Sequence, residues 1–352
     1  MNRSISRAGA ALGAALLIVA LSAAPAFACG GLIGPNGAVN LLRTTTLAGY
    51  HDGAEHYITA FQFAGGGGAF GSLTPLPGVP SGVEKGGDWT LQRLIRETEP
   101  VQLNDAVLRA AAPAAGAAEE LMKVRIDALD VTVLRGGAAA VGQWATEHGF
   151  RLPPDAPEVL DFYAERSPIF LAAVFDADAA AERGQAVGDG TPVHVTIPTA
   201  NPWVPLRILA LGKTSAERVD ADVYLLTDRR PALLPVPTGD NGLGLGHSAP
   251  ATVSLLDDLR SDKGMAWIPS SGWLTKVNID AAATDLAFDL AIDASGAGAP
   301  SRVMAGLDRP GTVAPPDRAS SIVPLILGVA LTVAGIGGML YISRRRPPLS
   351  MA

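Results

Sequence analysis

The sequence predicts an α+β fold, in which antiparallel sheets and packed helices form a body between an N-terminal leader and one C-terminal transmembrane helix. Three observations lead to this class. Strand-like and helix-like segments follow one another without the regular βα order of a parallel sheet. A hairpin signal opens the body, and an uncharged apolar run lies near the end of the chain.

Residues 1–28 have the three parts of a secretory signal peptide. Arg3 and Arg7 form a basic start, residues 8–21 form an apolar centre, and small residues surround the expected cleavage site after Ala28. Cleavage there makes Cys29 the mature N terminus, and lipidation of Cys29 is the alternative. Because Cys29 is the single cysteine of the chain, no intramolecular disulfide can form.

The body opens with two expected strands, residues 39–50 and 55–64. Between them, residues 51–54 read His-Asp-Gly-Ala. Asp-Gly is typical of a hairpin turn because the turn needs residues that tolerate positive φ. We therefore expect these two strands to pair antiparallel.

Further elements follow from local patterns along the body. Helices are expected at residues 88–97, 104–112, 138–148 and 158–166. Residues 121–134 are expected to form a strand or a strand pair, and further strands are expected at residues 169–175, 193–197, 222–226, 265–279 and 287–292. Asp88 is the expected N-cap of the first helix. The spaced prolines of residues 69–80 indicate an extended edge segment, and the glycines and prolines of residues 235–250 indicate a loop or a boundary between subdomains.

The expected body, residues 29–295, is followed by residues 296–321, which are rich in Gly, Ala, Pro, Asp and Arg and predict a disordered stalk. The uncharged apolar run then begins at Ile322 and ends at Ile342. As a helix it covers about 30 Å, the thickness of the bilayer core, and predicts a membrane anchor. Basic residues follow at once: Arg344, Arg345 and Arg346. By the positive-inside rule, residues 343–352 form a cytoplasmic tail and the body lies outside the cytoplasm.

The anchor carries a row of small residues at Ala330, Ala334 and Gly338. Such rows let two transmembrane helices approach closely, which predicts a weak homodimer, although they also arise by chance in helices rich in alanine and glycine. No Leu-Pro-x-Thr-Gly sorting motif precedes the run, so we expect the protein to stay in the membrane.

Charge excludes two classes of partner. The chain has 34 acidic residues against 27 Lys and Arg, a formal net charge of -7. Five of the arginines lie in the leader and the tail, so the body is more acidic still. Nucleic acid and anionic lipid headgroups would be repelled by such a surface.

Four stretches, taken in order, resemble one bacterial family. Residues 28–31 read Ala-Cys-Gly-Gly, residues 70–77 read Phe-Gly-Ser-Leu-Thr-Pro-Leu-Pro, residues 144–153 read Trp-Ala-Thr-Glu-His-Gly-Phe-Arg-Leu-Pro, and residues 162–163 read Phe-Tyr before a strand. The order and spacing are similar to those of the domain of unknown function 2330 family, over about residues 29–235.

Two departures accompany this resemblance. The second early cysteine of the family is missing, and Gly71-Ser72 stands where the family usually has tryptophan. The family has no established activity. The resemblance therefore implies an exported, membrane-anchored protein and adds no mechanism.

The hairpin tip carries four possible metal ligands, His51, Asp52, Glu55 and His56. Imidazole and carboxylate together suit a divalent metal ion. Their spacing matches no standard site, however, and an ordinary polar turn explains the same residues.

A second candidate is the stretch Gly-His-Ser-Ala-Pro at residues 246–250, which approaches the Gly-x-Ser-x-Gly elbow of serine hydrolases. Proline at the last position breaks the pattern.

Carboxylate pairs are abundant but indicate a solvated acidic face. Three tryptophans would suit a carbohydrate or peptide platform if exposed, and a core if buried: Trp203, Trp267 and Trp273.

No catalytic residue, cofactor or firm metal site is thus predicted. The sequence favours a non-enzymatic binding or structural module of the bacterial cell envelope, with the lipid bilayer and an envelope protein or glycan as partners. An extracytoplasmic hydrolase and a metal or small-ligand sensor are the alternatives.

Overall fold

The computed structural model describes residues 31–35, 37–38, 43–61, 70–98, 120–127, 129–175, 191–295 and 298–311. The chain divides into two compact units, Met1–Pro310 and Gly311–Ala352, and the first contains all the described helices and strands. No helix among the described residues has the length and apolar character needed to cross a membrane. Several predictions lie outside the described residues: the leader with Ala28 and Cys29, the helix at 104–112, the run from Ile322 to Ile342, the arginine cluster and the small-residue row.

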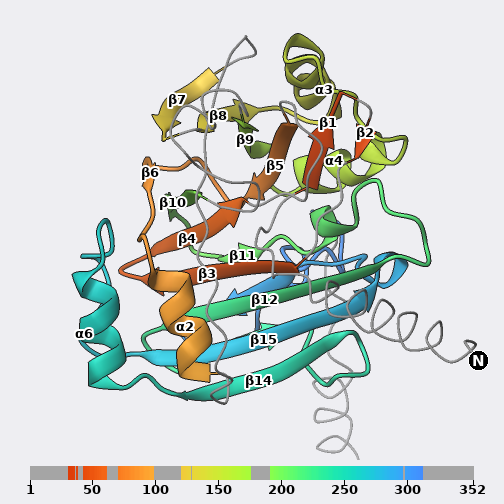
Figure 1. Ribbon diagram of the computed structural model, residues 1–352. Coiled ribbons are helices and arrows are strands. Elements are labelled where there is room, and N and C mark those ends of the chain that lie inside the picture. Colours follow the sequence, from red (N-terminus) through yellow and green to blue (C-terminus); the bar gives the residue numbers. More distant parts are fainter. Residues whose placement is uncertain are drawn as a thin grey trace, which may run out of the picture. The chain divides into compact units, whose positions relative to one another are not determined.

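The described residues form three sheets with helices packed on them, which confirms the α+β class (Figure 1). A six-stranded sheet has the order β2-β1-β5-β9-β8-β7. Its strands are β1 Gly31–Gly34, β2 Gly37–Ala38, β5 Phe70–Leu76, β7 Glu120–Ile126, β8 Leu129–Arg135 and β9 Ile169–Phe175. A small third sheet has the order β11-β16-β13. It contains β11 Trp203–Val204, β13 Ala232–Leu234 and β16 Leu290–Asp293.

The seven-stranded sheet has the order β14-β15-β12-β3-β4-β10-β6. Its strands are β3 Arg43–His51, β4 Ala54–Phe61, β6 Gly82–Lys85, β10 Thr191–Pro198, β12 Arg218–Thr227, β14 Leu243–Pro250 and β15 Trp273–Ala282. The helices are α2 Thr90–Thr98, α3 Ala138–Glu147, α4 Ala156–Ala164 and α6 Val253–Ser261, with short 3-10 turns η2 Arg207–Ala210 and η3 Ala283–Asp285. Described strand pairs are antiparallel except β3 with β12.

The predicted hairpin is confirmed. β3 and β4 pair antiparallel, with His51 opposite Ala54. Asp52 and Gly53 have φ values of 49° and 78°, so both central residues of the turn adopt the left-handed conformation that a two-residue hairpin requires.

The predicted loop or boundary at residues 235–250 is wrong where β14 forms an edge strand on β15. Glycine allows this pairing, because a Cβ on Gly246 would lie 2.3 Å from Oδ1 of Asn278. Helix α6, which follows, was not predicted, although Thr252 caps it by accepting a hydrogen bond from the Leu255 amide at 3.2 Å. The predicted strand at 265–279 begins only at Trp273.

The N terminus of helix α2 is hydrogen-bonded to a residue that is far away in the sequence. The sequence predicts Asp88 as the cap, but the Asp262 carboxylate accepts the amides of Asp88 at 3.1 Å and Trp89 at 3.0 Å. Asp262 also accepts the hydroxyl of Thr90 at 2.8 Å. Gly87 leaves room for this carboxylate, because a Cβ there would lie 2.3 Å from Asp262 Oδ2.

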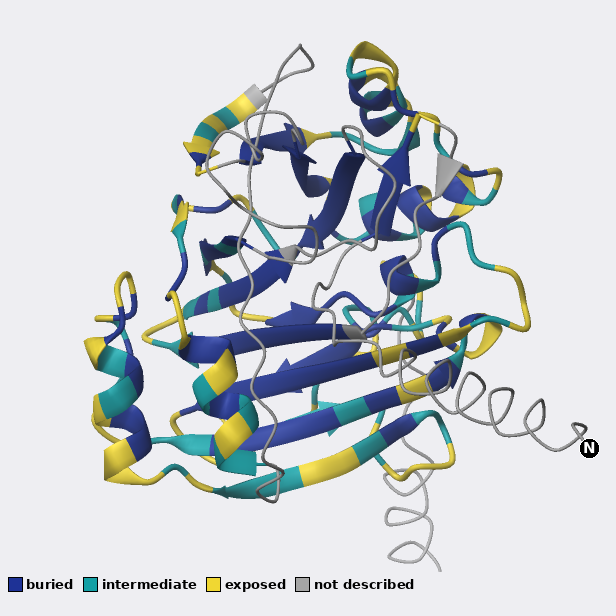
Figure 2. Ribbon diagram, viewed as in Figure 1, coloured by how far each residue is buried: buried dark blue, intermediate teal, exposed yellow. Residues whose placement is uncertain are grey.

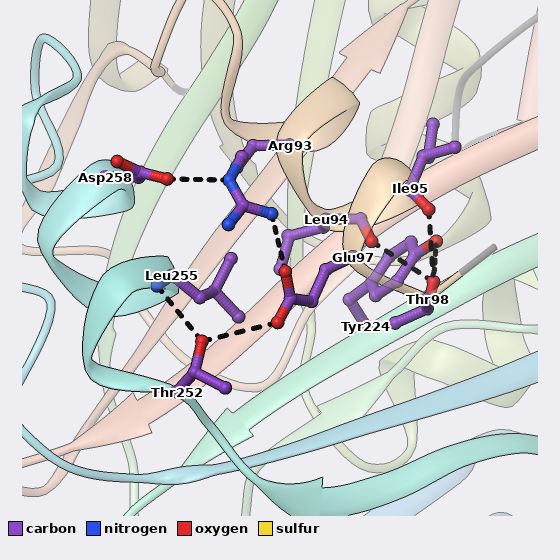
Figure 3. Close-up of polar contacts among 9 residues, drawn as sticks. All are labelled: Arg93, Leu94, Ile95, Glu97, Thr98, Tyr224, Thr252, Leu255 and Asp258. Carbon is purple, nitrogen blue, oxygen red and sulfur yellow. Dashed lines mark hydrogen bonds and ion pairs between the residues drawn. The ribbon is translucent and has the colours of Figure 1, made fainter. Parts of the chain in front are cut away.

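The seven-stranded sheet separates two clusters of buried apolar residues. The larger cluster includes residues of both large sheets, α3 and α4. The smaller lies on the opposite face of the seven-stranded sheet, under α2 and α6. Figure 2 shows buried strands through both large sheets and mixed exposure along α2, α6 and β14. In Figure 3, Arg93 of α2 donates to Asp258 of α6 at 2.8 Å, and Thr252 donates to Glu97 at 3.3 Å, so polar contacts join the two helices above this cluster.

Residues 298–311 are folded, although the sequence predicts that a disordered stalk begins at residue 296. Ala305 is fully buried, and its carbonyl accepts a hydrogen bond from the Asp289 amide at 3.0 Å. The carbonyl of Met304 accepts a hydrogen bond from Arg166. These long-range contacts extend the folded body beyond its expected end at residue 295.

Candidate functional site

A buried ion pair lies beneath α4. The side chains of Arg166 and Asp289 are 2% and 0% exposed, and Arg166 Nη2 lies 2.7 Å from Asp289 Oδ2. The hydroxyl of Tyr163 donates to Asp289 Oδ1 at 2.8 Å. The amides of Leu206 and Arg207 donate to the same oxygen at 2.7 and 3.1 Å. A buried carboxylate is tolerated only when hydrogen bonds and an opposite charge satisfy it, as they do here.

Tyr163 connects this ion pair to η2. Its hydroxyl accepts a hydrogen bond from the Ile208 amide at 2.8 Å while it donates to Asp289. Burial and the negative charge of Asp289 raise the pKa of Tyr163 well above 10. The phenol therefore stays protonated and holds α4, η2 and the residue before β16 in one arrangement.

A cavity of about 380 Å³ lies beside this network. We call it the α4 cavity, and it is lined by Glu158, Asp161, Phe162, Glu165, Arg166, Arg207, Ala287, Gly306, Asp308, Arg309 and Pro310. The Phe162 ring carries the guanidinium carbons of Arg166 and Arg207 at 4.0 and 4.3 Å from its centroid, within the range of cation–π attraction. Gly306 has a φ of 70°, and a Cβ there would lie 2.2 Å from the ring.

Several charges that line the α4 cavity are already satisfied. Arg207 forms an ion pair with Glu158. The carboxylate of Asp308 accepts hydrogen bonds from Arg302 at 2.8 and 3.0 Å, which lowers the pKa of Asp308. Asp161 accepts the amide of Ala138 at 3.1 Å. The pairs hold the walls of the cavity in place.

Glu165 and Arg309 differ from these residues. Within the part of the chain that the structure describes, neither side chain has a hydrogen-bond or ion-pair partner, and both line the cavity. The cavity thus presents one carboxylate and one guanidinium to a ligand. Apolar periodicity predicts a helix at residues 158–166, which includes Glu165, whereas Phe162 and Tyr163 stand out only through the family resemblance.

The four possible metal ligands of the hairpin do not converge. Neighbouring residues of a strand point to opposite faces, so Glu55 and His56 are separated by the sheet. His51 Nδ1 lies 2.7 Å from Asp228 Oδ1, and Asp52 is exposed at the turn. Among the described residues, no group of three or more His, Cys, Asp or Glu side chains is arranged to hold a metal ion.

Glu55 is instead fully buried in the larger core. Its Oε2 accepts the Trp203 amide at 3.3 Å, and its Oε1 has no hydrogen-bond partner. Burial raises the pKa of Glu55 to about 8, although the Trp203 hydrogen bond opposes the shift. Glu55 is therefore protonated at neutral pH.

His56 lies on the other face of the sheet, against His194 of β10. Nδ1 of His56 is 2.9 Å from Nε2 of His194, and Nδ1 of His194 is 3.1 Å from Glu84 Oε1. Trp267 stacks on His56 with ring centroids 3.9 Å apart. Burial lowers the pKa of each histidine to about 4. The sequence gives no local signal for this pair, because His194 is far from His56 along the chain.

The hydrolase candidates also remain apart. His247 and Ser248 are consecutive on β14, so their side chains point to opposite faces. The hydroxyl of Ser248 accepts a hydrogen bond from Trp273 Nε1 at 2.9 Å. Of the other two tryptophans, Trp203 is fully buried and Trp267 packs on His56, so the three form no common platform.

Comparison with known proteins gives one match to a family and several weak structural likenesses. No curated protein matches the sequence. A crystal structure of mutated baculovirus P35 after caspase cleavage has a TM-score of 0.38 and 8% identity, and covers 71% of this chain and 98% of that chain. The crystal structure of baculovirus P35 has a TM-score of 0.36 and 8% identity, with 73% and 92% covered. Such low TM-scores carry no inference about this chain.

The family match agrees with the resemblance seen in the sequence. The model of the family described as "Uncharacterized protein conserved in bacteria (DUF2330)" matches residues 23–234. This stretch contains the end of the predicted leader, the hairpin, α2 to α4 and most of both large sheets. It is more than half of the chain, and the protein therefore belongs to this bacterial family.

Proposed function

We propose that this protein is an exported binding module of the bacterial cell envelope, anchored by the apolar run from Ile322 to Ile342, and that the α4 cavity is its ligand site. The observation that supports binding is the cavity itself, about 380 Å³ in volume and surrounded by charges of both signs. Its size falls within the range of small-molecule sites.

The composition of the lining favours binding over nucleophilic catalysis. None of the described lining residues is a serine, cysteine, threonine, histidine or lysine. No nucleophile and base of the Ser–His or Cys–His kind can therefore form in the cavity. The separation of His247 and Ser248 removes the other basis for a hydrolase.

The position of the cavity along the chain suits an anchored receptor. Gly306, Asp308 and Arg309 line it, and residues 311–321 alone separate this segment from the predicted anchor. Eleven residues reach at most about 40 Å when fully extended.

Site-specific photocrosslinking tests the ligand site. A photoreactive amino acid replaces Ala287, which lines the cavity, in the full chain in its own membrane, and a matched variant carries it at Val253, which is 68% exposed on α6 and outside the cavity. We expect a discrete adduct, identified by mass spectrometry, at position 287 and none at 253. The absence of an adduct at 287, or the same adduct at both positions, would contradict the proposed site.

Membrane attachment is tested separately by fractionation. The full chain should remain in the membrane pellet after an alkaline carbonate wash, whereas a variant that ends at residue 321 should be released. Release of both proteins would contradict the proposed anchor without affecting the crosslinking result.

A further inference from the structure

We infer that the α4 cavity binds a small compound that carries both an ammonium group and a carboxylate, that is, an amino acid or a short peptide with free ends. This inference rests on the proposed function and names the ligand class. Its basis is a pair of exposed charges that lack a protein partner among the described residues, Glu165 and Arg309, at one cavity.

Most charged side chains around the α4 cavity already have an ion-pair partner. Arg166 is paired with Asp289, Arg207 with Glu158, and Asp308 with Arg302. These pairs cancel most of the charge around the cavity. Asp161 keeps its charge but is hydrogen-bonded to the amide of Ala138. Glu165 and Arg309 have opposite signs and no protein partner among the described residues, so a ligand that pairs with both needs one cation and one anion.

The two side chains bind opposite kinds of charged group. The guanidinium of Arg309 presents donors that match a carboxylate in a bidentate manner. The carboxylate of Glu165 accepts hydrogen bonds from an ammonium group, which has three donors and no acceptor. A zwitterion satisfies both side chains together, whereas an uncharged ligand leaves both charges unpaired.

Polyanions and bare metal cations fit the lining of the cavity less well than a zwitterion does. Four carboxylates line the cavity, from Glu158, Asp161, Glu165 and Asp308, against three arginines, so the lining has no excess of positive charge to attract phosphate groups or other polyanions. In the part of the chain that the structure describes, no group of three or more His, Cys, Asp or Glu side chains is arranged to hold a metal ion. The mixed lining is therefore complementary to a ligand with balanced charge.

The apolar residues of the lining can accommodate a side chain of the ligand. The ring of Phe162 is held by Arg166 and Arg207, while Ala287 and Pro310 add apolar surface. A volume of about 380 Å³ exceeds that of a single amino acid and accommodates a peptide of two or three residues, at the lower end of the range for ligand pockets.

The test is isothermal titration calorimetry on the full chain in detergent, with a set of free amino acids and dipeptides. Each is compared with its N-acetyl form, which lacks the ammonium, and its amide form, which lacks the carboxylate. We expect at least one zwitterion to bind, and both blocked forms to bind at least tenfold more weakly. Equal binding of free and blocked forms, or no binding by any zwitterion, would overturn the inference.

Two variants assign the charges. E165Q should weaken binding of the free compound, so that the free and N-acetyl forms bind with similar affinity. R309Q should make the affinities of the free and amide forms similar. Glu147 and Arg151, which do not line the cavity, provide the matched controls E147Q and R151Q, with unchanged affinities. A crosslinked adduct at position 287 without zwitterion binding would leave the proposed function standing and reject the ligand class.

Discussion

Replacement of Glu55 by glutamine should make the protein more stable at pH 8 and no more stable at pH 5. Glu55 is 0% exposed, and burial raises its pKa from 4.5 to about 8. Between these two pKa values the folded protein keeps a proton that the unfolded chain releases. Stability therefore falls as pH rises through this window, since the unfolded state binds fewer protons.

The magnitude follows from the width of this window. A shift of one unit corresponds to about 1.4 kcal/mol, so the wild type loses on the order of 3 to 5 kcal/mol by pH 8. Glutamine cannot ionise and avoids this loss. Its extra amide donors lack partners in the core, at a cost of about 1 to 2 kcal/mol. The variant should thus gain about 1 to 4 kcal/mol over wild type at pH 8 and lose at most about 1 kcal/mol at pH 5, where the wild type has itself lost almost 1 kcal/mol.

Urea denaturation followed by tryptophan fluorescence, at pH 5 and at pH 8, measures this change. Both proteins retain His56 and His194, so the titration of the histidines cancels in the difference. The control is E147Q, at an exposed position, which should follow the wild type at both pH values. If the difference between Glu55→Gln and wild type were the same at pH 5 and pH 8, a buried, protonated Glu55 would be refuted.

Three further predictions concern other buried contacts. His194 has a pKa lowered to about 4, so stability should fall by up to about 3 kcal/mol as pH drops from 6.5 towards 4; H194Q should flatten a plot of Tm against pH, and an unchanged slope would contradict a neutral His194. D262A should lower the free energy of unfolding, measured by urea denaturation, by about 2 kcal/mol, because the amides of Asp88 and Trp89 and the hydroxyl of Thr90 at the start of α2 lose their acceptor; an effect below about 0.5 kcal/mol would mean that water replaces the carboxylate. G49A should cost about 1 to 3 kcal/mol and change the fluorescence of Trp267, whose ring lies 2.2 Å from the added Cβ; an unaltered spectrum would show that this contact is absent.

Local signals in the sequence predicted those elements whose partners are close along the chain. The Asp-Gly turn at residues 52–53 predicted the β3–β4 hairpin. Apolar periodicity predicted α2, α3 and α4 within a few residues. In each case the information lies inside one short segment, so no distant partner is needed.

Some elements that depend on distant partners were not predicted. β14 is rich in glycine and becomes a strand only because β15 lies beside it. The cap of α2 is Asp262, and no pattern around Asp88 indicates it. In the sequence, these glycines indicate a flexible loop. In the fold, they let the backbone lie close to neighbouring side chains, Asn278 at Gly246 and Asp262 at Gly87.

The same limit applies to the candidate site. The α4 cavity combines residues from α4, from η2 and from residues 306–310, which are far apart in the sequence. Glu165 and Arg309 belong to no known motif. Composition even predicted that the last of these segments was a stalk, because its few apolar residues gave no period, whereas Ala305 is packed in the core.

The parallel pairing of β3 with β12 also affects how the chain can fold during synthesis. β3 leaves the ribosome early and can pair at once only with β4, and an isolated two-stranded hairpin is marginally stable in water. Its other edge stays open until residues 218–227 have been made, and β15 must then follow to cover β12. Nearly the whole body is therefore synthesised before its central sheet is complete. Until then the nascent chain exposes unpaired strand edges, and we expect it to depend on chaperones that bind such edges.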